Sequence, residues 1–255
     1  MKHRGLIHDY LIKYPLRYCI PVFIGVLTAE DQTMRASATA TMLDLYGRKL
    51  LITDDHVIAS FEKFLSEDSR VKFQTGAEIF DPRNRCIDRH ATKDLFVIDA
   101  TGLTLDDRSS DEELPKLEFY VVPNNTSWPP PLVKVSDTII LGGFPGAMRR
   151  EEGFNVVCGS YSIASIPVTG VFADHFSCNI DRTTWQSTRA DDQWVREFTR
   201  WGGLSGGPVF QDGPGLLRPR LTGFIQQYHA EYDQLQIAHA ASINVDGTIA
   251  PGRLF

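Results

Sequence analysis

Short runs rich in valine, isoleucine, threonine and aromatic residues recur along the whole chain, and clusters of glycine, proline, aspartate and asparagine separate them. Short strands at this even spacing are typical of an all-β sandwich or barrel. Helical periodicity is weak and short wherever it occurs. The predicted strands are Ile20–Leu27, Ala36–Leu45, Lys49–Thr53, Arg70–Phe73, Leu95–Ala100, Leu117–Val122, Thr138–Leu141, Phe154–Ile163, Pro208–Phe210, Arg220–Ile225 and Leu235–Ile243. The predicted helices are Gly5–Lys13, Val57–Leu65 and Asp191–Phe198.

A proline-rich segment near the middle of the chain predicts a division into two β-units. Residues 123–132 combine turn-forming residues with three consecutive prolines, which favour a stiff, extended connection. We therefore expect a first β-barrel over 18–122 and a second over 133–255, joined by this linker. Residues 1–17 are expected to be an N-terminal extension with a short helix.

Composition excludes several classes of protein. The chain has 255 residues, of which 42% are apolar and 23% charged, with a net charge of −6. A basic nucleic-acid surface is therefore not expected. Pro21 and Gly25 interrupt the longest apolar stretch, so no membrane span is predicted, and the first residues do not resemble a signal peptide. The four cysteines lack zinc-type or disulfide-scaffold spacing. We expect a cytoplasmic protein without a metal or cofactor.

The strongest chemical signal is the segment Gly-Gly-Leu-Ser-Gly-Gly-Pro, in which Ser205 is flanked by glycines. Glycines permit a tight turn whose amides converge on one point, as an acyl-transfer enzyme requires around its nucleophile. An ordinary glycine-rich turn is the structural alternative. A nucleophile elbow is disfavoured because few residues follow Ser205, and a phosphate-binding loop is disfavoured because it lacks lysine.

Two further residues have positions that suit catalysis. His56 follows the predicted strand Lys49–Thr53, where an imidazole could serve as a general base. Asp94 directly precedes the strand Leu95–Ala100, where its carboxylate could orient an imidazole. Each residue alone is a weak signal, but the chain order His56, Asp94, Ser205 matches the His–Asp–Ser order of chymotrypsin-type barrels.

With these motifs, the sequence resembles trypsin-like serine peptidases of the chymotrypsin fold, and bacterial members most closely. Thr-Asp-Asp-His-Val around His56 is similar to the family's histidine block, and Asp94-Leu-Phe-Val-Ile to its aspartate block. Gly203-Leu-Ser-Gly-Gly-Pro is similar to the serine block. The segment from Val135 to Pro145 and the segment 221–225 also resemble family motifs. The resemblance covers residues 20 to 243 and implies two six-stranded antiparallel β-barrels packed face to face.

The resemblance also implies roles for individual residues. Ser205 would attack the scissile carbonyl, His56 would transfer protons, and Asp94 would hold the imidazole. The amides of Gly203 and Ser205 would form the oxyanion hole. The segment Gly223–Tyr228 would border the cleft, where a polypeptide substrate would add as a strand. The candidate substrate-pocket residues are Thr199, Gln226, Tyr228 and His239.

The chain departs from the family pattern at several positions. Asp54 and Asp55 replace two small residues before His56, and they would favour imidazolium unless they point to solvent. Leu204 replaces the aspartate that family zymogens use for activation. Val57 and Trp201 stand where secreted members carry disulfide cysteines, which supports an intracellular location.

Two functions remain open from the sequence. The first is a serine endopeptidase, and a regulatory protein partner could switch it through the segment before Ser205. The second is a catalytically silent pseudo-peptidase that uses its cleft to bind peptides.

Overall fold

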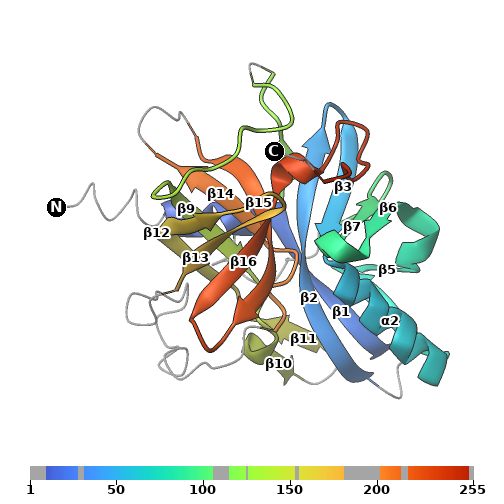
Figure 1. Cartoon of the computed structure of the whole chain (residues 1–255). Coiled ribbons are helices and arrows are strands. Elements are labelled where there is room, and N and C mark those ends of the chain that lie inside the picture. Colours follow the sequence, from blue (N-terminus) through green and yellow to red (C-terminus); the bar gives the residue numbers. More distant parts are fainter. Residues whose placement is uncertain are drawn as a thin grey trace.

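The computed structural model describes residues 10–27, 32–105, 115–124, 126–152, 155–180, 202–213 and 218–252. Within these ranges the chain is mostly β, and two β-units lie side by side with helix α2 on the outer side of the first (Figure 1). The all-β class, the packing of two units and the scarcity of helices confirm the fold class that the sequence predicted. No helix in the described ranges is long and apolar enough to cross a membrane.

The first unit is a curled eight-stranded sheet. Seven strands follow the order β5-β4-β1-β2-β3-β7-β6, and β8 adds to β2 as a short parallel pair. Alternate residues of these strands point inward, so Ile24, Leu51, Phe73 and Phe96 share one buried cluster. The strands are β1 (Cys19–Leu27), β2 (Gln32–Leu45), β3 (Arg48–Thr53), β4 (Val71–Thr75), β5 (Glu78–Phe80), β6 (Cys86–His90), β7 (Leu95–Asp99) and β8 (Tyr120–Val121).

The second unit contains a closed barrel of six antiparallel strands in the order β12-β13-β16-β15-β14-β9. Its interior is filled by apolar side chains, among them Leu141, Tyr161, Phe176 and Ile237. A two-stranded ribbon of β10 and β11 lies beside it. The strands are β9 (Thr138–Gly143), β10 (Arg149–Glu152), β11 (Asn155–Cys158), β12 (Tyr161–Val171), β13 (His175–Asn179), β14 (Pro208–Asp212), β15 (Arg220–His229) and β16 (Gln234–His239).

A third apolar cluster joins the two units. It contains Leu43 and Leu50 from the first unit together with Phe210 and Phe224 from the barrel. Trp128 of the predicted linker is also buried in it, and its indole N–H donates to the carbonyl of Ile243 at 2.7 Å. Burial of apolar surface is the main source of stability, so this shared core holds the units together.

The segment before β1 packs against the rest of the molecule. The 3₁₀ turn η1 (Pro15–Tyr18) leads into β1, and Tyr14 and Tyr18 are buried with it. The Tyr14 ring lies 5.0 Å from the Phe210 ring, and the Tyr18 ring lies 5.4 Å from that of Tyr120. Tyr14 of the predicted N-terminal extension therefore packs against the barrel of the second unit. Of the predicted helix Gly5–Lys13, residues 10–13 are helical and residues 1–9 lie outside the described ranges.

Helix α2 (Asp55–Glu67) covers the first sheet beside β4 and begins directly after β3. Val57, Ile58 and Phe61 form its buried face, and the Phe61 ring lies 5.8 Å from that of Phe73. His56 is the second residue of this helix, close behind the end of β3. The predicted helix Val57–Leu65 is thus confirmed with longer bounds.

Some predicted elements differ from the structure. The predicted strand Phe154–Ile163 is two strands, β11 and β12, and the predicted strand Leu117–Val122 pairs only at β8. The predicted strand Leu235–Ile243 ends at His239, where the 3₁₀ turn η6 (Ala240–Ser242) begins. The predicted helix Asp191–Phe198 lies outside the described residues. The remaining 3₁₀ turns are η2 (Pro82–Arg85), η3 (Ala91–Lys93) and η4 (Gly146–Met148).

Candidate active site

His56 and Asp94 form a directly bonded pair between α2 and the start of β7. The Nδ1 atom of His56 lies 2.7 Å from Oδ2 of Asp94, and the backbone N–H of His56 donates to Oδ1 at 2.9 Å. An ionised carboxylate only accepts hydrogen bonds, so this geometry assigns the proton to Nδ1 and leaves Nε2 as an acceptor. The imidazole is half exposed, which leaves Nε2 accessible to a reacting group.

The backbone around Asp94 fixes the direction of its carboxylate. Asp94 has a left-handed conformation, with φ 47° and ψ 49°, directly after η3. Such a conformation is uncommon for a residue with a side chain, although aspartate adopts it more readily than most. The turn places the side chain against the first turn of α2, where it receives both hydrogen bonds from His56.

Ser205 lies in a turn that the first sheet holds in place. The amide of Thr39 on β2 donates to the carbonyl of Ser205 at 2.9 Å. The hydroxyl of Thr39 donates to the carbonyl of Gly203 at 2.7 Å, and the hydroxyl of Thr41 donates to that of Gly206 at 2.7 Å. Both threonines are fully buried. The serine turn of one unit is therefore bonded to the sheet that precedes His56.

Two glycines of this turn are required by its geometry. Gly203 has φ +102° and Gly206 has φ +85°, in the region that favours glycine. A Cβ atom at Gly206 would overlap the carbonyl oxygen of Thr39, and one at Gly203 would overlap the amide of Gly146. Leu204, between them, is buried in the barrel core and anchors the turn from the other side.

The hydroxyl of Ser205 is directed at a strand of the barrel. Its Oγ donates to the carbonyl of Gln226 on β15 at 3.2 Å, and no hydrogen bond joins it to His56 within the described residues. The side chain of Gln226 is buried and its Nε2 donates to the carbonyl of Lys93, the residue before Asp94. Gln226 thus connects the serine and the aspartate through its backbone and its side chain.

The amides of Gly203 and Ser205 are the candidate oxyanion donors. Neither donates a hydrogen bond to another residue in the described part of the chain. Backbone donors without an intramolecular partner at a turn next to a hydroxyl are available to a developing negative charge.

The two aspartates before His56 have different environments. Asp55, the first residue of α2, is bonded to the guanidinium of Arg89 on β6, which also contacts Glu62 at 2.9 Å. Asp54 points inward and is fully buried. Its Oδ2 lies 3.9 Å from Nδ1 of His56, and burial, together with the charge of Asp94, raises the pKa of its carboxyl well above its usual range.

The candidate pocket residues are spread over the barrel. The hydroxyl of Tyr228 on β15 donates to Asp233, so the ring lies along the β15–β16 end of the barrel. His239 is buried at the end of β16, its Nε2 donates to the carbonyl of Phe172 at 3.0 Å, and burial lowers its pKa. Thr199 lies outside the described residues. A substrate-binding role for Gln226, Tyr228 and His239 stays a prediction.

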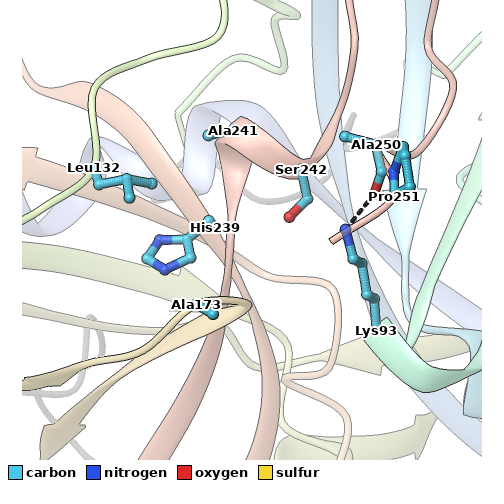
Figure 2. Close-up of a pocket in the computed structure, with 8 residues that line it drawn as sticks. All are labelled: Lys93, Leu132, Ala173, His239, Ala241, Ser242, Ala250 and Pro251. Atoms are coloured by element: carbon cyan, nitrogen blue, oxygen red, sulfur yellow. Dashed lines mark hydrogen bonds between the residues drawn. The ribbon is translucent and has the colours of Figure 1, made fainter. Parts of the chain in front are cut away.

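His239 lines a small pocket on the side of Lys93 and the C-terminal segment. Figure 2 shows the side chain of Lys93 pointing along this pocket to the carbonyl of Ala250, to which its Nζ donates. Burial lowers the pKa of the lysine. The complete lining is Lys93, Leu132, Ala173, His239, Ala241, Ser242, Ala250 and Pro251. The hydrogen bond from Lys93 to Ala250 thereby connects the turn that carries Asp94 to the C-terminal segment of the described chain.

The structure brings the predicted His56 and Asp94 together, and the sequence missed the residues that hold the serine turn in place. Thr39 and Thr41 are ordinary strand threonines in the sequence, and nothing in the pattern signals their contact with the serine turn. Asp54, His56 and Asp94 each offer a ligand atom, and these atoms lie within 4.8 Å of one another. However, the 2.7 Å separation of Nδ1 and Oδ2 is explained by a hydrogen bond.

The sequence matches no model of a known protein family, and no curated protein matches it. The curled sheet of the first unit and the closed six-stranded barrel of the second are compatible with a chymotrypsin-like fold.

Proposed function

We propose that this protein is a serine endopeptidase in which Ser205, His56 and Asp94 act as nucleophile, general base and orienting carboxylate. The observation that carries the proposal is the pair of hydrogen bonds from His56 to Asp94, 2.7 Å from Nδ1 and 2.9 Å from the backbone amide. They fix the tautomer in which Nε2 can take a proton from a hydroxyl. The glycine turn supplies that hydroxyl from Ser205.

The chemistry follows from these positions. The Ser205 hydroxyl leaves the Gln226 carbonyl, its proton passes to Nε2 of His56, and Oγ attacks the substrate carbonyl. The oxyanion that forms is stabilised by the amides of Gly203 and Ser205, and Asp94 stabilises the imidazolium. His56 then protonates the leaving amine, and water hydrolyses the acyl-enzyme by the same route.

The contacts of Asp55 and Gln226 support a catalytic site over a catalytically silent one. Asp55 is compensated by Arg89, so its charge is paired rather than directed at His56. Gln226 holds both the serine hydroxyl and the backbone beside Asp94, which is an arrangement that positions the two parts of the triad relative to one another. A cytoplasmic location, a regulatory partner and a polypeptide substrate remain expectations from the sequence.

A fluorophosphonate reagent tests the proposal, since it reacts with serines activated by a general base. We expect it to label Ser205 in the wild type, with no labelling of Ser205→Ala and strongly reduced labelling of His56→Ala. Equal labelling of wild type and Ser205→Ala would refute the proposal.

One observation favours the second candidate, a peptide-binding module without turnover. The Ser205 hydroxyl donates to Gln226 rather than to His56. In that case a library of unstructured peptides would bind without being cleaved, and Ser205→Ala would bind them equally well. Cleavage that disappears in Ser205→Ala would reject this candidate.

A further inference from the structure

Asp54 is a fully buried carboxyl at the centre of the candidate site, and neither of its oxygens has a hydrogen-bond partner within the described residues. It occupies the position before the first residue of α2, where an aspartate ordinarily accepts an amide of the first helical turn. No such cap forms here. The side chain is instead directed into the junction between α2, the Asp94 turn and the serine turn.

The groups around Asp54 do not supply a compensating positive charge. Asp94 from the η3 turn and Asp55 from α2 are like charges, and Arg89 of β6 is bonded to Asp55 rather than to Asp54. His56 of α2 presents Nδ1 at 3.9 Å, but that atom is bonded to Asp94. A buried carboxylate without a cation or donors is strongly disfavoured relative to its neutral form.

Two donors of the serine turn influence Asp54, and both already donate elsewhere. Hydrogen-bonding interactions with the Ser205 hydroxyl and the Gly206 amide favour the ionised carboxyl and partly oppose the effect of burial, although neither has the geometry of a full hydrogen bond. The hydroxyl donates to the carbonyl of Gln226 at 3.2 Å, and the amide donates to that of Ile225 at 2.7 Å. Ser205 Oγ still has lone pairs that can accept a hydrogen bond.

We propose that Asp54 is a positioning residue for the nucleophile: once the Ser205 hydroxyl has left the Gln226 carbonyl, the neutral carboxyl of Asp54 donates to Ser205 Oγ and leaves the hydroxyl's own proton available to His56. This inference rests on the proposed function. When Asp54 loses its proton to solvent, the carboxylate becomes an acceptor for the Ser205 hydroxyl. It then competes with Nε2 of His56 for the same proton, so the nucleophile becomes less reactive at alkaline pH.

The first test is the pH profile of fluorophosphonate labelling. We expect the wild-type rate to decline on the alkaline side. Asp54→Asn keeps an N–H donor but cannot ionise, so its profile should lack that decline. The matched control is Asp55→Asn, which removes the adjacent carboxyl and should keep the decline. Asp54→Ala removes the donor and should lower the rate about tenfold, the usual effect of losing one hydrogen bond.

An alkaline decline that persists unchanged in Asp54→Asn would overturn the proposal, because a merely structural aspartate would leave the profile as it is. The second test reads the carboxyl directly and does not require activity. In ¹³C NMR of the wild type, with the signal assigned through its scalar couplings to the backbone of Asp54, the carboxyl should be neutral at pH 7. A titration near pH 4 would overturn the proposal, even if both variants failed to fold.

The two tests also separate this inference from the proposed function. Labelling of Ser205 combined with an ionised Asp54 at pH 7 would leave the peptidase in place and reject the role of Asp54. A neutral Asp54 in a wild type that is never labelled would reject the peptidase, and the positioning of a nucleophile with it.

Discussion

Thr39 and Ser205 are joined by a backbone hydrogen bond of 2.9 Å, although they belong to different β-units. The hydroxyl of Thr39 adds a second bond to the same turn, at the carbonyl of Gly203, and accepts the amide of Phe144 at 3.0 Å. One buried threonine of the first sheet therefore holds the turn that presents the candidate nucleophile.

Replacing Thr39 with valine should destabilise the protein. Valine has nearly the same shape but lacks the hydroxyl that donates to the Gly203 carbonyl and accepts the Phe144 amide. A buried polar group without a partner costs roughly 1–3 kcal/mol, so we expect a loss of at least this size in the free energy of unfolding, measured with urea. Thr104→Val, at an exposed position, is the control and should be close to neutral. An equal effect of the two substitutions would contradict the assigned contacts.

Gly206→Ala should distort the serine turn. The residue has φ +85°, and a Cβ would overlap the carbonyl of Thr39. Left-handed strain alone costs on the order of 1–3 kcal/mol, and the overlap adds to it. Thermal unfolding should show a clear decrease in Tm. Gly213→Ala is the matched control, since a Cβ there meets nothing within 4 Å. A Gly206→Ala protein as stable as the wild type would show that the turn has another conformation.

Asp54→Asn should become more stable than the wild type as the pH rises. Burial raises the pKa of Asp54 in the folded state above its unfolded value of about 3.9. The stability linked to its proton is therefore present below pH 4 and is lost as the pH rises toward the folded pKa. The variant loses this dependence. Its advantage in urea unfolding should grow by about 1.4 kcal/mol per pH unit over that window.

Asp246→Asn is a control for which the change in stability with pH should have the opposite sign. Hydrogen bonds from the side chain and the amide of Thr248 lower the pKa of Asp246. Its stabilising effect is present above its unfolded pKa and is lost as the pH falls, so the variant should become less stable than the wild type as the pH rises. If both variants changed in the same direction, the assignment of Asp54 as a neutral buried acid would be wrong.

Thiol reactivity should distinguish Cys86 from Cys178. Burial raises the pKa of the Cys178 thiol to about 12. Partial burial also raises the pKa of Cys86, but its side chain is exposed to reagent. Because the thiolate is the reactive form, iodoacetamide at pH 8 should modify Cys86 in the native protein and Cys178 only after unfolding. Mass spectrometry of the tryptic peptides would measure both. Modification of native Cys178 at a rate similar to that of Cys86 would contradict its position in the barrel core.

The sequence predicted the strands whose apolar residues fill a core, and it missed strands without that pattern. Strand β6 reads Cys-Ile-Asp-Arg-His and lies at the edge of its sheet, so its polar residues resemble those of a loop. Strand β13 carries small and polar residues among its buried ones. Hydrophobic periodicity reports burial on one face and cannot report pairing by backbone hydrogen bonds alone.

In the candidate site, too, some features could be predicted from the sequence and others depend on the tertiary fold. The glycines around Ser205 are visible in the sequence because a tight turn restricts the residue type. The inward direction of Asp54 was open, because an aspartate before a helix ordinarily caps it or faces solvent. The bond between Thr39 and Gly203 joins residues 164 positions apart, and only the tertiary fold brings them together.

The aromatic contacts of the N-terminal segment have a consequence for synthesis of the chain. Tyr14 and Tyr18 are among the first described residues to leave the ribosome, whereas Phe210, against which the Tyr14 ring packs, is among the last. Until Phe210 emerges, these rings lack a partner that buries them in the finished protein. The growing chain therefore exposes an aromatic surface until residue 210 has emerged, and this is the surface that a chaperone would have to cover.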